Sequence, residues 1–339
     1  MQLPFSSPSH RLCTAPMMDW TDRHARYFFR LFSPKLWVYT EMVTTGALLY
    51  GGNPNRFLNY SVEEHPIALQ LGGNQPELLA ECAKMAEAWN YDEVNLNLGC
   101  PSPRVSSGSF GACLMRERTL VAECVKTMSE ACGLPITVKC RLGIDYDDDY
   151  EFLAQLVEEV GKAGCHTWII HARKAWLTGL NPKQNRDIPP LDYERVYRLK
   201  RDFPQYQIIV NGGIQTLEEG LRHIEQCDGI MLGRAAYQNS SILLDADNFC
   251  EDRFETRLSS NDFLNERYAI AKTYGSYLEQ QLKLGVAFRT ITRPVLSLFN
   301  GCSGARVFRR TLSDFSGTPT HAQALDLWHQ ALAKMVNPD

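Results

Sequence analysis

The sequence predicts an α/β protein, a (β/α)8 TIM barrel followed by a C-terminal all-helical domain. Short β-prone runs alternate with helical periodicity over residues 12–232, which favours a closed parallel barrel over an open doubly wound sheet. Nearly every run ends in a polar or glycine-rich feature, at the position where barrel enzymes carry their chemistry. After about residue 245 the strand signals disappear and helical periodicity dominates.

The composition is that of a globular protein with a sizeable core. The 339 residues are 44% hydrophobic and 22% charged, enough for one large domain and a smaller one. Eleven cysteines, an odd number without a Cys-x-x-Cys pair, argue against a disulfide framework or a metal site and predict a cytoplasmic location. The N-terminal segment lacks the apolar stretch of a signal peptide, and no run approaches the roughly 18 apolar residues that span a bilayer.

The predicted strands are short aliphatic runs bounded by Gly, Pro and Asn. They span residues 12–15, 37–40, 67–71, 93–98, 136–140, 167–171, 207–211 and 229–232. The predicted barrel helices span residues 23–32, 76–89, 118–131, 150–163, 192–203 and 217–225. Helices over 261–283, 286–299 and 322–335 follow. We therefore expect a flexible N-terminus (1–10), a catalytic barrel (11–245) and a helical domain (246–339).

The fourth predicted strand and the turn after it are the most informative segment. Asn95 and Asn97 alternate along the strand and point the same way, so their amides need partners, and a bound ligand is one candidate. Cys100 follows in a Gly-Cys-Pro turn just beyond the strand end. Most lone cysteines are small buried hydrophobes, but this setting favours a functional thiol.

Three other strand ends carry polar side chains with more than one interpretation. Lys139 indicates a buried ion pair with a neighbouring carboxylate such as Glu41, a Schiff-base nucleophile, or a cation beside an electron-rich cofactor. His171 is either a core histidine or a ligand contact. Gln70 offers both a donor and an acceptor, which suits an amide-like edge such as the pyrimidine ring of a flavin.

Glycines follow the seventh and eighth strands, where barrels commonly bind phosphate. Gly212, Gly213 and Gly233 permit close backbone approach, and Arg234 adds a charged fork that matches phosphate geometry. These features predict a phosphate-bearing ligand. Residues 175–190 form a long irregular loop after the sixth strand, and a loop of that length is usually functional or disordered.

The net charge of the chain and the local charge of one segment point to different partners. A formal net charge of −4 argues weakly against a nucleic-acid partner. Residues 280–313, however, contain six cations and no Asp or Glu, and we call this segment the cationic tract. Its cations are Lys283, Arg289, Arg293, Arg306, Arg309 and Arg310. The tract indicates either a nucleic-acid contact or an ordinary solvated helix surface.

In combination, these motifs resemble the tRNA-dihydrouridine synthases, from about residue 12 to residue 312. The resemblance rests on residues 15–22 (APMMDWTD), 95–102 (NLNLGCPS), 108–114 (GSFGACL) and 138–143 (VKCRLG). Shorter matches are Glu41-Met42, Gln70-Leu71, 170–173 (IHAR), 211–213 (NGG) and Gly233-Arg234. The opening motif and residues 180–190 (LNPKQNRDIPP) resemble the bacterial A subfamily, which modifies positions 20 and 20a of the tRNA D-loop.

The resemblance implies an FMN-binding barrel and a helical tRNA-binding domain, with NADPH or NADH as reductant. It implies that reduced FMN passes hydride to C6 of a uracil ring while Cys100 protonates C5. The positions matching FMN contacts are Pro16, Met17, Met18, Gln70, Lys139, His171, Asn211, Gly212, Gly213, Gly233 and Arg234. Asn97 matches a contact to the target uridine. Lys183, Arg186, Arg306 and Arg309 resemble tRNA-contact positions.

The chemistry agrees with the residue types. The uracil C5=C6 bond is conjugated to a carbonyl, so hydride arrives at C6 and an acid must complete C5. A free thiol has a pKa of about 8.5 and is mostly protonated at neutral pH. The target base must leave the folded tRNA to be reached, as base-modifying enzymes generally require. We expect a monomer with no membrane or metal partner.

Three alternatives remain open from the sequence. A flavin barrel acting on a free pyrimidine or an orotate-like molecule explains the strand ends equally well, but gives the cationic tract and the helical domain no purpose. A Schiff-base aldolase would use Lys139 and would not be yellow. An RNA-binding protein on an inactive barrel would have no need of Cys100, Lys139 and His171.

Overall fold

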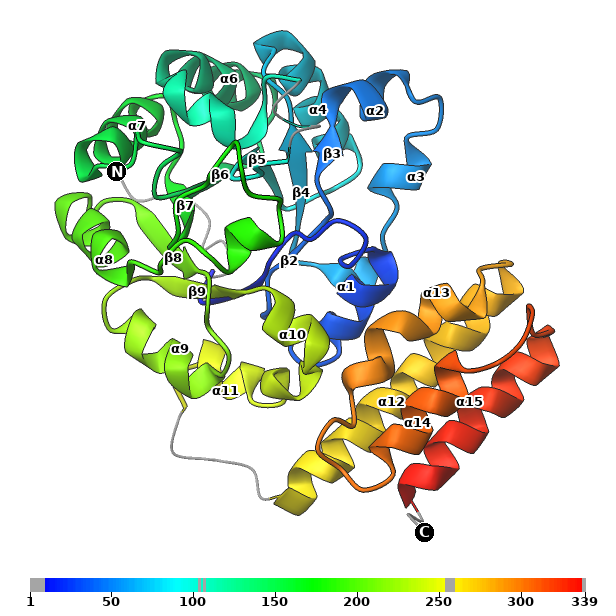
Figure 1. The fold of residues 1–339 in the computed structure, drawn as a ribbon. Coiled ribbons are helices and arrows are strands. Elements are labelled where there is room, and N and C mark those ends of the chain that lie inside the picture. The colour runs from blue at the N-terminus through cyan, green and yellow to red at the C-terminus, as the bar shows by residue number, and fades with distance from the viewer. Residues whose placement is uncertain (1–9, 103–104, 106–107, 254–259, 337–339) are drawn as a thin grey trace.

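A computed structural model describes residues 10–102, 105, 108–253 and 260–336, and the predicted barrel is confirmed (Figure 1). The parallel sheet runs in the order β1-β9-β8-β7-β6-β5-β4-β2, and a bridge between Cys13 and Trp37 brings its two ends together. The barrel strands are β1 Leu12–Thr14, β2 Val38–Tyr39, β4 Ile67–Gly72, β5 Glu93–Leu98, β6 Ile136–Arg141, β7 Thr167–His171, β8 Gln207–Asn211 and β9 Gly229–Leu232. The short β3, Val43–Thr44, pairs with β4 off this path.

The predicted barrel helices are confirmed, and their ends differ from the predicted ones by at most two residues. They are α1 Arg23–Arg30, α4 Pro76–Ala88, α6 Arg118–Ala131, α7 Tyr150–Lys162, α8 Tyr193–Asp202 and α9 Leu217–Ile224. The side chains of Asp22, Asp149 and Asp192 each accept a hydrogen bond from the backbone N–H of the third residue of α1, α7 and α8, respectively. Such caps satisfy donors that a helix start otherwise leaves unpaired.

Short helical elements fill the connections that the sequence left irregular. They are α2 Thr45–Tyr50, α3 Asn55–Leu58, η1 Val62–Glu64, η2 Gly111–Arg116, η3 Gln184–Arg186, α10 Arg234–Gln238, η4 Ser240–Leu243 and α11 Ala246–Cys250. Among them, η3 lies inside the long loop predicted over residues 175–190. The flexible N-terminus predicted for 1–10 lies, apart from His10, outside the described residues.

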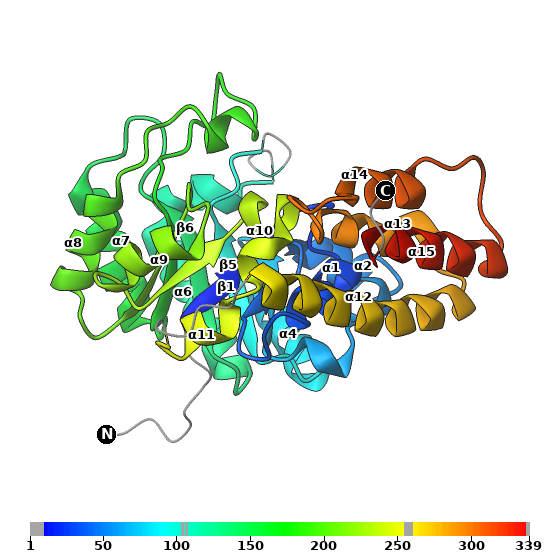
Figure 2. The same ribbon diagram turned by 90° about the horizontal axis from the view of Figure 1, so that it is seen from below.

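The C-terminal region is helical, as predicted, and packs beside the barrel (Figures 1 and 2). Its elements are α12 Ser260–Lys283, α13 Phe288–Thr292, η5 Arg293–Ser297, α14 Ala305–Ser313 and α15 His321–Val336. Tyr277 on α12 stacks on Tyr27 of α1 with 3.9 Å between ring centroids. The Tyr277 hydroxyl also lies 2.8 Å from Nδ1 of the buried His24, so α1 joins the two regions.

One predicted helix of this region differs from the structure, and one helix was not predicted. A single helix over 286–299 is replaced by α13 and the tighter η5, and Pro294 stands in the first turn of η5, where its missing N–H is harmless. The sequence analysis also missed α14. Its buried Ala305, Phe308 and Leu312 have the i, i+3, i+7 spacing that would have predicted a helix.

The barrel interior is divided into an apolar and a polar half. The apolar half comes mainly from β1, β2 and β7 to β9, with one residue from β4: Cys13, Ala15, Trp37, Tyr39, Ala68, Ile169, Ile209 and Met231. On β4 to β6, buried Gln70, Glu93, Asn95 and Thr137 face the interior instead. The residues between them, such as Leu96 and Val138, belong to the larger core that includes the surrounding helices.

Two features of the described residues bear on possible partners. None of their helices has the length and hydropathy that crossing a bilayer requires. No group of three or more His, Cys, Asp or Glu side chains within the described ranges could hold a metal ion.

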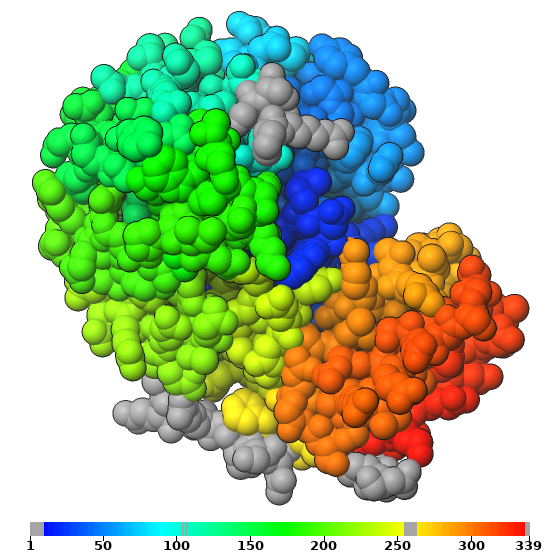
Figure 3. All heavy atoms as spheres, in the orientation of Figure 1, coloured from blue at the N-terminus to red at the C-terminus, as the bar shows by residue number. Residues whose placement is uncertain are grey.

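On the face shown in Figure 3, the beginning of the described chain (blue) reaches the surface between barrel loops (green) and C-terminal helices (orange).

Gly229→Ala tests how closely β9 approaches the start of β1. A Cβ there would lie 2.1 Å from the His10 carbonyl oxygen, so backbone would have to move. We expect urea unfolding to show a loss of about 1–3 kcal/mol, the usual penalty of overpacking. The control is Gly46→Ala on α2, where a Cβ meets nothing within 4 Å and stability should hold or rise slightly. Equal stability of the two variants would contradict this packing.

Candidate active site

Polar side chains converge at the carboxyl ends of four neighbouring strands, β5 to β8. The pairing places Asn97 of β5 beside Lys139 of β6, and His171 of β7 beside Asn211 of β8. The Lys139 ammonium donates to Asn211 Oδ1 at 2.9 Å, and Asn211 Nδ2 donates to the Met231 carbonyl at 2.7 Å. The structure therefore brings the predicted strand-end residues together at one end of the barrel.

The turn that carries Cys100 is bound to the strand before it. Asn97 Oδ1 accepts hydrogen bonds from the backbone N–H groups of Gly99, at 3.1 Å, and Cys100, at 3.0 Å. The Cys100 carbonyl accepts from Ala112 N at 3.0 Å, which joins the turn to η2. Cys100 itself is half-buried. One side chain thus sets the backbone that positions the thiol.

Asn95 and Asn97 share a face of β5, as predicted, but take different partners. Asn97 Nδ2 donates to Gln70 Oε1 at 2.8 Å. Asn95 is fully buried between Gln70 and Thr137, receiving a hydrogen bond from the first and donating one to the second. A ligand is not needed to explain Asn95, because protein groups satisfy its amide.

Arg141, which the sequence analysis did not single out, braces the thiol turn against the long loop after β7. Its Nε donates to the Gly99 carbonyl at 2.9 Å, and its Nη1 donates to the carbonyls of Lys174, at 3.1 Å, and Asn185, at 2.9 Å. Burial lowers the pKa of Arg141 to about 10. Its position two residues after Lys139, on the same inward face of β6, was the available signal.

Lys139 is a partly buried cation whose hydrogen-bond partner is an amide. The predicted alternative of an ion pair with Glu41 is not found, because Glu41 instead accepts from the backbone N–H of Asp19 at 2.5 Å. Burial, with the nearby charge of Arg141, lowers the pKa of Lys139 to about 8. The ammonium form therefore dominates at neutral pH and is lost as the pH rises through that value.

The same surroundings act on His171 and Cys100. Burial and the charge of Arg141 lower the pKa of His171 well below its usual range, so its ring is neutral. Burial raises the pKa of the Cys100 thiol, opposed by the Ser102 N–H and by the positive charges of Arg141, Arg186 and Lys139. The thiol is therefore protonated at neutral pH.

Glycines form an open cradle after β8 and β9. Gly212 and Gly213 have φ of +107° and +79°, which other residues rarely adopt. A Cβ on Gly212 would lie 2.5 Å from the His171 ring, while a Cβ on Gly233 would find its nearest neighbours, Ala15 and Met17, only at 3.9 and 4.0 Å. The His171 ring therefore occupies the space beside Gly212, whereas the space beside Gly233 is open.

Other predicted residues lie in the loops after β1 and β7 and at the start of α10. Pro16 and Met17 are half-buried in the loop after β1, whereas Met18 is 56% exposed. Arg234, at the start of α10, donates to Asp187 at 2.7 Å, which joins α10 to the long loop. In that loop Lys183 and Arg186 are exposed.

The cationic tract is less free than its sequence suggests. Arg293 pairs with Asp22 at 3.0 Å, and Lys283 pairs with Glu279 at 2.7 Å. Both acids lie outside residues 280–313. They neutralise part of the positive charge that the sequence of the tract suggests. Arg306 is exposed on α14.

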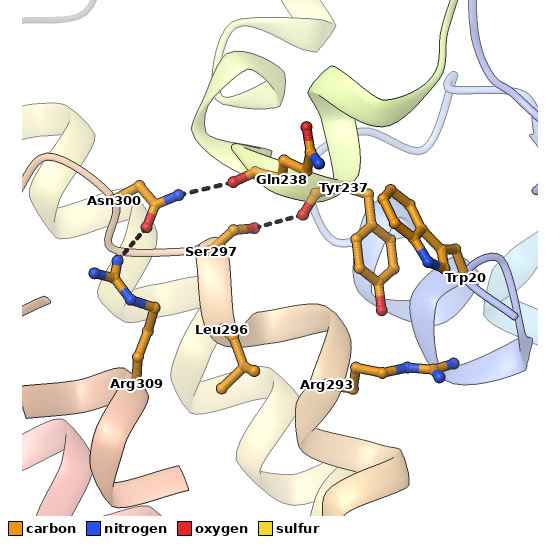
Figure 4. A pocket seen from close by; sticks show the side chains of 8 residues that line it. All are labelled: Trp20, Tyr237, Gln238, Arg293, Leu296, Ser297, Asn300 and Arg309. Carbon is orange, nitrogen blue, oxygen red and sulfur yellow. Dashed lines mark hydrogen bonds between the residues drawn. The ribbon is translucent and has the colours of Figure 1, made fainter. Parts of the chain in front are cut away.

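A pocket of about 370 Å³ lies where α10 meets η5 and α14 (Figure 4). Arg309 donates to Asn300 Oδ1 at 2.5 Å on one side of it. On the other side Trp20 stacks on Tyr237 with 4.7 Å between ring centroids. The sequence analysis did not single out these aromatics, because Trp20 and Tyr237 are distant in the chain and only the fold brings them together.

A model of the dihydrouridine synthase family matches residues 13–337. The chain belongs to this family. It is similar to the tRNA-dihydrouridine(20/20a) synthase of Escherichia coli K12, with 53% identity over 90% of this chain and 86% of that protein. The synthase of the same name from Yersinia pestis is 50% identical over 98% of this chain and 93% of its own length. The predicted family, and an enzyme as its function, are confirmed.

Among solved structures, morphinone reductase matches with a TM-score of 0.52 and 12% identity, over 75% of this chain and 88% of that one. At this identity the likeness concerns the fold alone, and it agrees with the barrel described above.

Proposed function

We propose that this dihydrouridine synthase reduces uridine to 5,6-dihydrouridine at positions 20 and 20a of the tRNA D-loop, with FMN and NADPH or NADH. The similarity to proteins named tRNA-dihydrouridine(20/20a) synthase over 90% of the chain is the observation that carries this proposal. A cytoplasmic location and a monomeric state, expected from the sequence, belong to the same proposal.

The residues at the barrel mouth fit a flavin phosphate cofactor. Gly213 is exposed and Gly212 and Gly233 are half-buried, and none of them carries a side chain that would keep a phosphate away from the backbone. Arg173 has a buried Nε without a hydrogen-bond partner, and the pKa of Arg173 is lowered first by burial and also by the charge of Arg234. An anionic group would give Arg173 Nε the partner it lacks, whereas Arg234 already pairs with Asp187.

We assign the cofactor contacts to the predicted set. They are Pro16, Met17, Met18, Gln70, Lys139, His171, Asn211, Gly212, Gly213, Gly233 and Arg234. In this assignment the phosphate lies near the glycine cradle and Arg234, while Lys139 places its cation beside the flavin ring. When bound and reduced, FMN supplies the hydride that a uracil ring accepts at C6.

Cys100 is the proposed proton donor to C5. Its raised pKa keeps the proton on sulfur at neutral pH, which suits a general acid rather than a nucleophile. Asn97 orients the turn through two backbone N–H groups, and its position beside Lys139 also supports the proposed contact to the target uridine. Arg141 completes the support through the Gly99 carbonyl.

The proposed tRNA contacts are Lys183 and Arg186 beside the barrel mouth and Arg306 and Arg309 on α14. The stacked Trp20 and Tyr237 line the same pocket as Arg309. Tyr237 also shares α10 with Arg234, whose partner Asp187 follows Arg186 in the chain. Cations that contact phosphates set the orientation of a nucleic acid without reading its bases. The helical domain would then hold tRNA while the barrel acts on one base.

Cys100→Ala should separate the two halves of the reaction. We expect flavin reduction by NADPH within twofold of wild type, but uridine reduction at least 100-fold slower, the usual contribution of a general acid. Dihydrouridine in tRNA is measured by mass spectrometry of nucleosides. The matched control is Cys113→Ala, a half-buried thiol that donates to the Phe110 carbonyl. Comparable turnover of the Cys100 and Cys113 variants would remove the assigned role.

The pKa of Lys139, lowered to about 8, predicts pH-dependent flavin binding. Its positive charge attracts an anionic cofactor below that pH and is lost above it. Titration of apoprotein with FMN should therefore show binding that weakens between pH 7 and pH 9, by at most about tenfold per pH unit. Lys139→Met should bind more weakly at pH 7 and show a flatter profile. Parallel profiles for both proteins would refute the assignment.

Arg306→Ala combined with Arg309→Ala should weaken tRNA binding without changing flavin reduction. If each contacts one phosphate, the slope of log affinity against log salt should fall by roughly 1.5 in total. Filter binding over a range of KCl concentrations measures it. The control pair, Lys126→Ala with Lys162→Ala, removes two exposed cations from α6 and α7. An equal slope for both pairs would make the α14 cations ordinary surface.

A further inference from the structure

A continuous chain of side-chain hydrogen bonds crosses the barrel interior to the Cys100 turn. We call it the polar column; from bottom to top it consists of His10, Glu93, Thr137, Asn95, Gln70 and Asn97. Its four lower strand residues, Glu93, Thr137, Asn95 and Gln70, are at most 1% exposed. They come from β4, β5 and β6, and none except Gln70 figures in the proposed reaction.

Every amide in the polar column donates toward Glu93. Asn97 Nδ2 donates to Gln70 Oε1, and Gln70 Nε2 donates to Asn95 Oδ1, both at 2.8 Å. Asn95 Nδ2 then donates to Thr137 Oγ1 at 2.8 Å, and the Thr137 hydroxyl donates to Glu93 Oε1 at 2.6 Å. The bonds therefore run in one direction along the whole chain.

The two ends of the polar column require this same direction independently. At the bottom, the Glu93 carboxylate can only accept, from Thr137 and from His10 Nε2 at 2.6 Å. At the top, the N–H groups of Gly99 and Cys100 can only donate, so Asn97 must turn its oxygen to them. Reversing any link would set two donors or two acceptors face to face.

The position of Glu93 makes a packing explanation insufficient. Glu93 lies four residues before Asn97, about 13 Å away along β5. A buried charge network is usually no more stabilising than apolar side chains of similar volume. The other half of the interior is filled with such apolar side chains. What the network adds is a fixed orientation of the Asn97 amide.

We propose that Glu93 and Thr137 are positioning residues, which act through Asn95, Gln70 and Asn97 to hold the Gly99–Cys100 backbone for uridine reduction. This inference rests on the proposed function. Because one Asn97 hydrogen is used on Gln70, the column also leaves Asn97 a single N–H, a donor suited to a carbonyl oxygen of the target base. Loss of the column would free the turn and this donor together.

Thr137→Val is the test, because valine has nearly the same shape but neither accepts from Asn95 nor donates to Glu93. The matched control, Thr137→Ser, keeps the hydroxyl. We expect hydrogen exchange of the Gly99 and Cys100 amides to accelerate in Thr137→Val by roughly tenfold or more, the effect of losing one buried hydrogen bond. Thr137→Ser should exchange within about threefold of wild type.

The same proteins, loaded with FMN, give the catalytic readout. We expect uridine reduction to slow by roughly tenfold or more in Thr137→Val, with flavin reduction by NADPH within twofold of wild type and with rescue by Thr137→Ser. Wild-type exchange and turnover in Thr137→Val would overturn the proposal. Equal losses in the Val and Ser variants would also overturn it, because packing would then explain them.

Glu93→Gln keeps the test valid if Thr137→Val does not fold. Glutamine has the same shape but carries a donor, so both directions of the polar column become possible. We expect faster exchange at Gly99 and Cys100 and slower uridine reduction; wild-type values for both would show that the carboxylate does not set the direction. If wild-type enzyme itself left tRNA uridine unreduced, the proposed function would fail, while exchange, which needs no turnover, would still judge the column.

Discussion

The candidate site depends on one side-chain oxygen, Asn97 Oδ1, which accepts hydrogen bonds from the backbone N–H groups of Gly99 and Cys100. This interaction converts the end of β5 into a turn that presents Cys100, and Arg141 locks the turn from the opposite side through the Gly99 carbonyl. The proton-donor role proposed for the thiol depends on this geometry. Burial, which keeps the thiol protonated, follows from the same placement.

Much of the architecture could be predicted from the sequence, because barrel strands and amphipathic helices have local periods. The ends of the strands could be predicted from the same local patterns. Lys139, His171 and Asn211 do meet at one end of the barrel. Local pattern failed where geometry depends on distant residues. Pro294 divided a helix that apolar spacing had made continuous, and Asp22 neutralises Arg293 from a different part of the chain.

The partners of buried polar groups were the least predictable feature. Asn95 was expected to need a partner, but a single sequence does not reveal that Thr137 and Gln70 provide it across two strand pairings. The inward-facing position of Arg141 could be read from its spacing from Lys139, but the carbonyl groups that Arg141 contacts and the partners of Glu93 could not be read from the strand sequence. Membership of the dihydrouridine synthase family rules out the aldolase alternative, and a free-pyrimidine reductase would differ from the proposed enzyme in its substrate rather than in its fold.

The most direct test combines wild-type enzyme, FMN, NADPH and unmodified tRNA in D2O, with free uridine present as competitor. The account predicts dihydrouridine at D-loop positions 20 and 20a, with deuterium from solvent at C5, and no reduction of the free nucleoside. Reduction of free uridine in preference to tRNA, or product without solvent deuterium at C5, would contradict it.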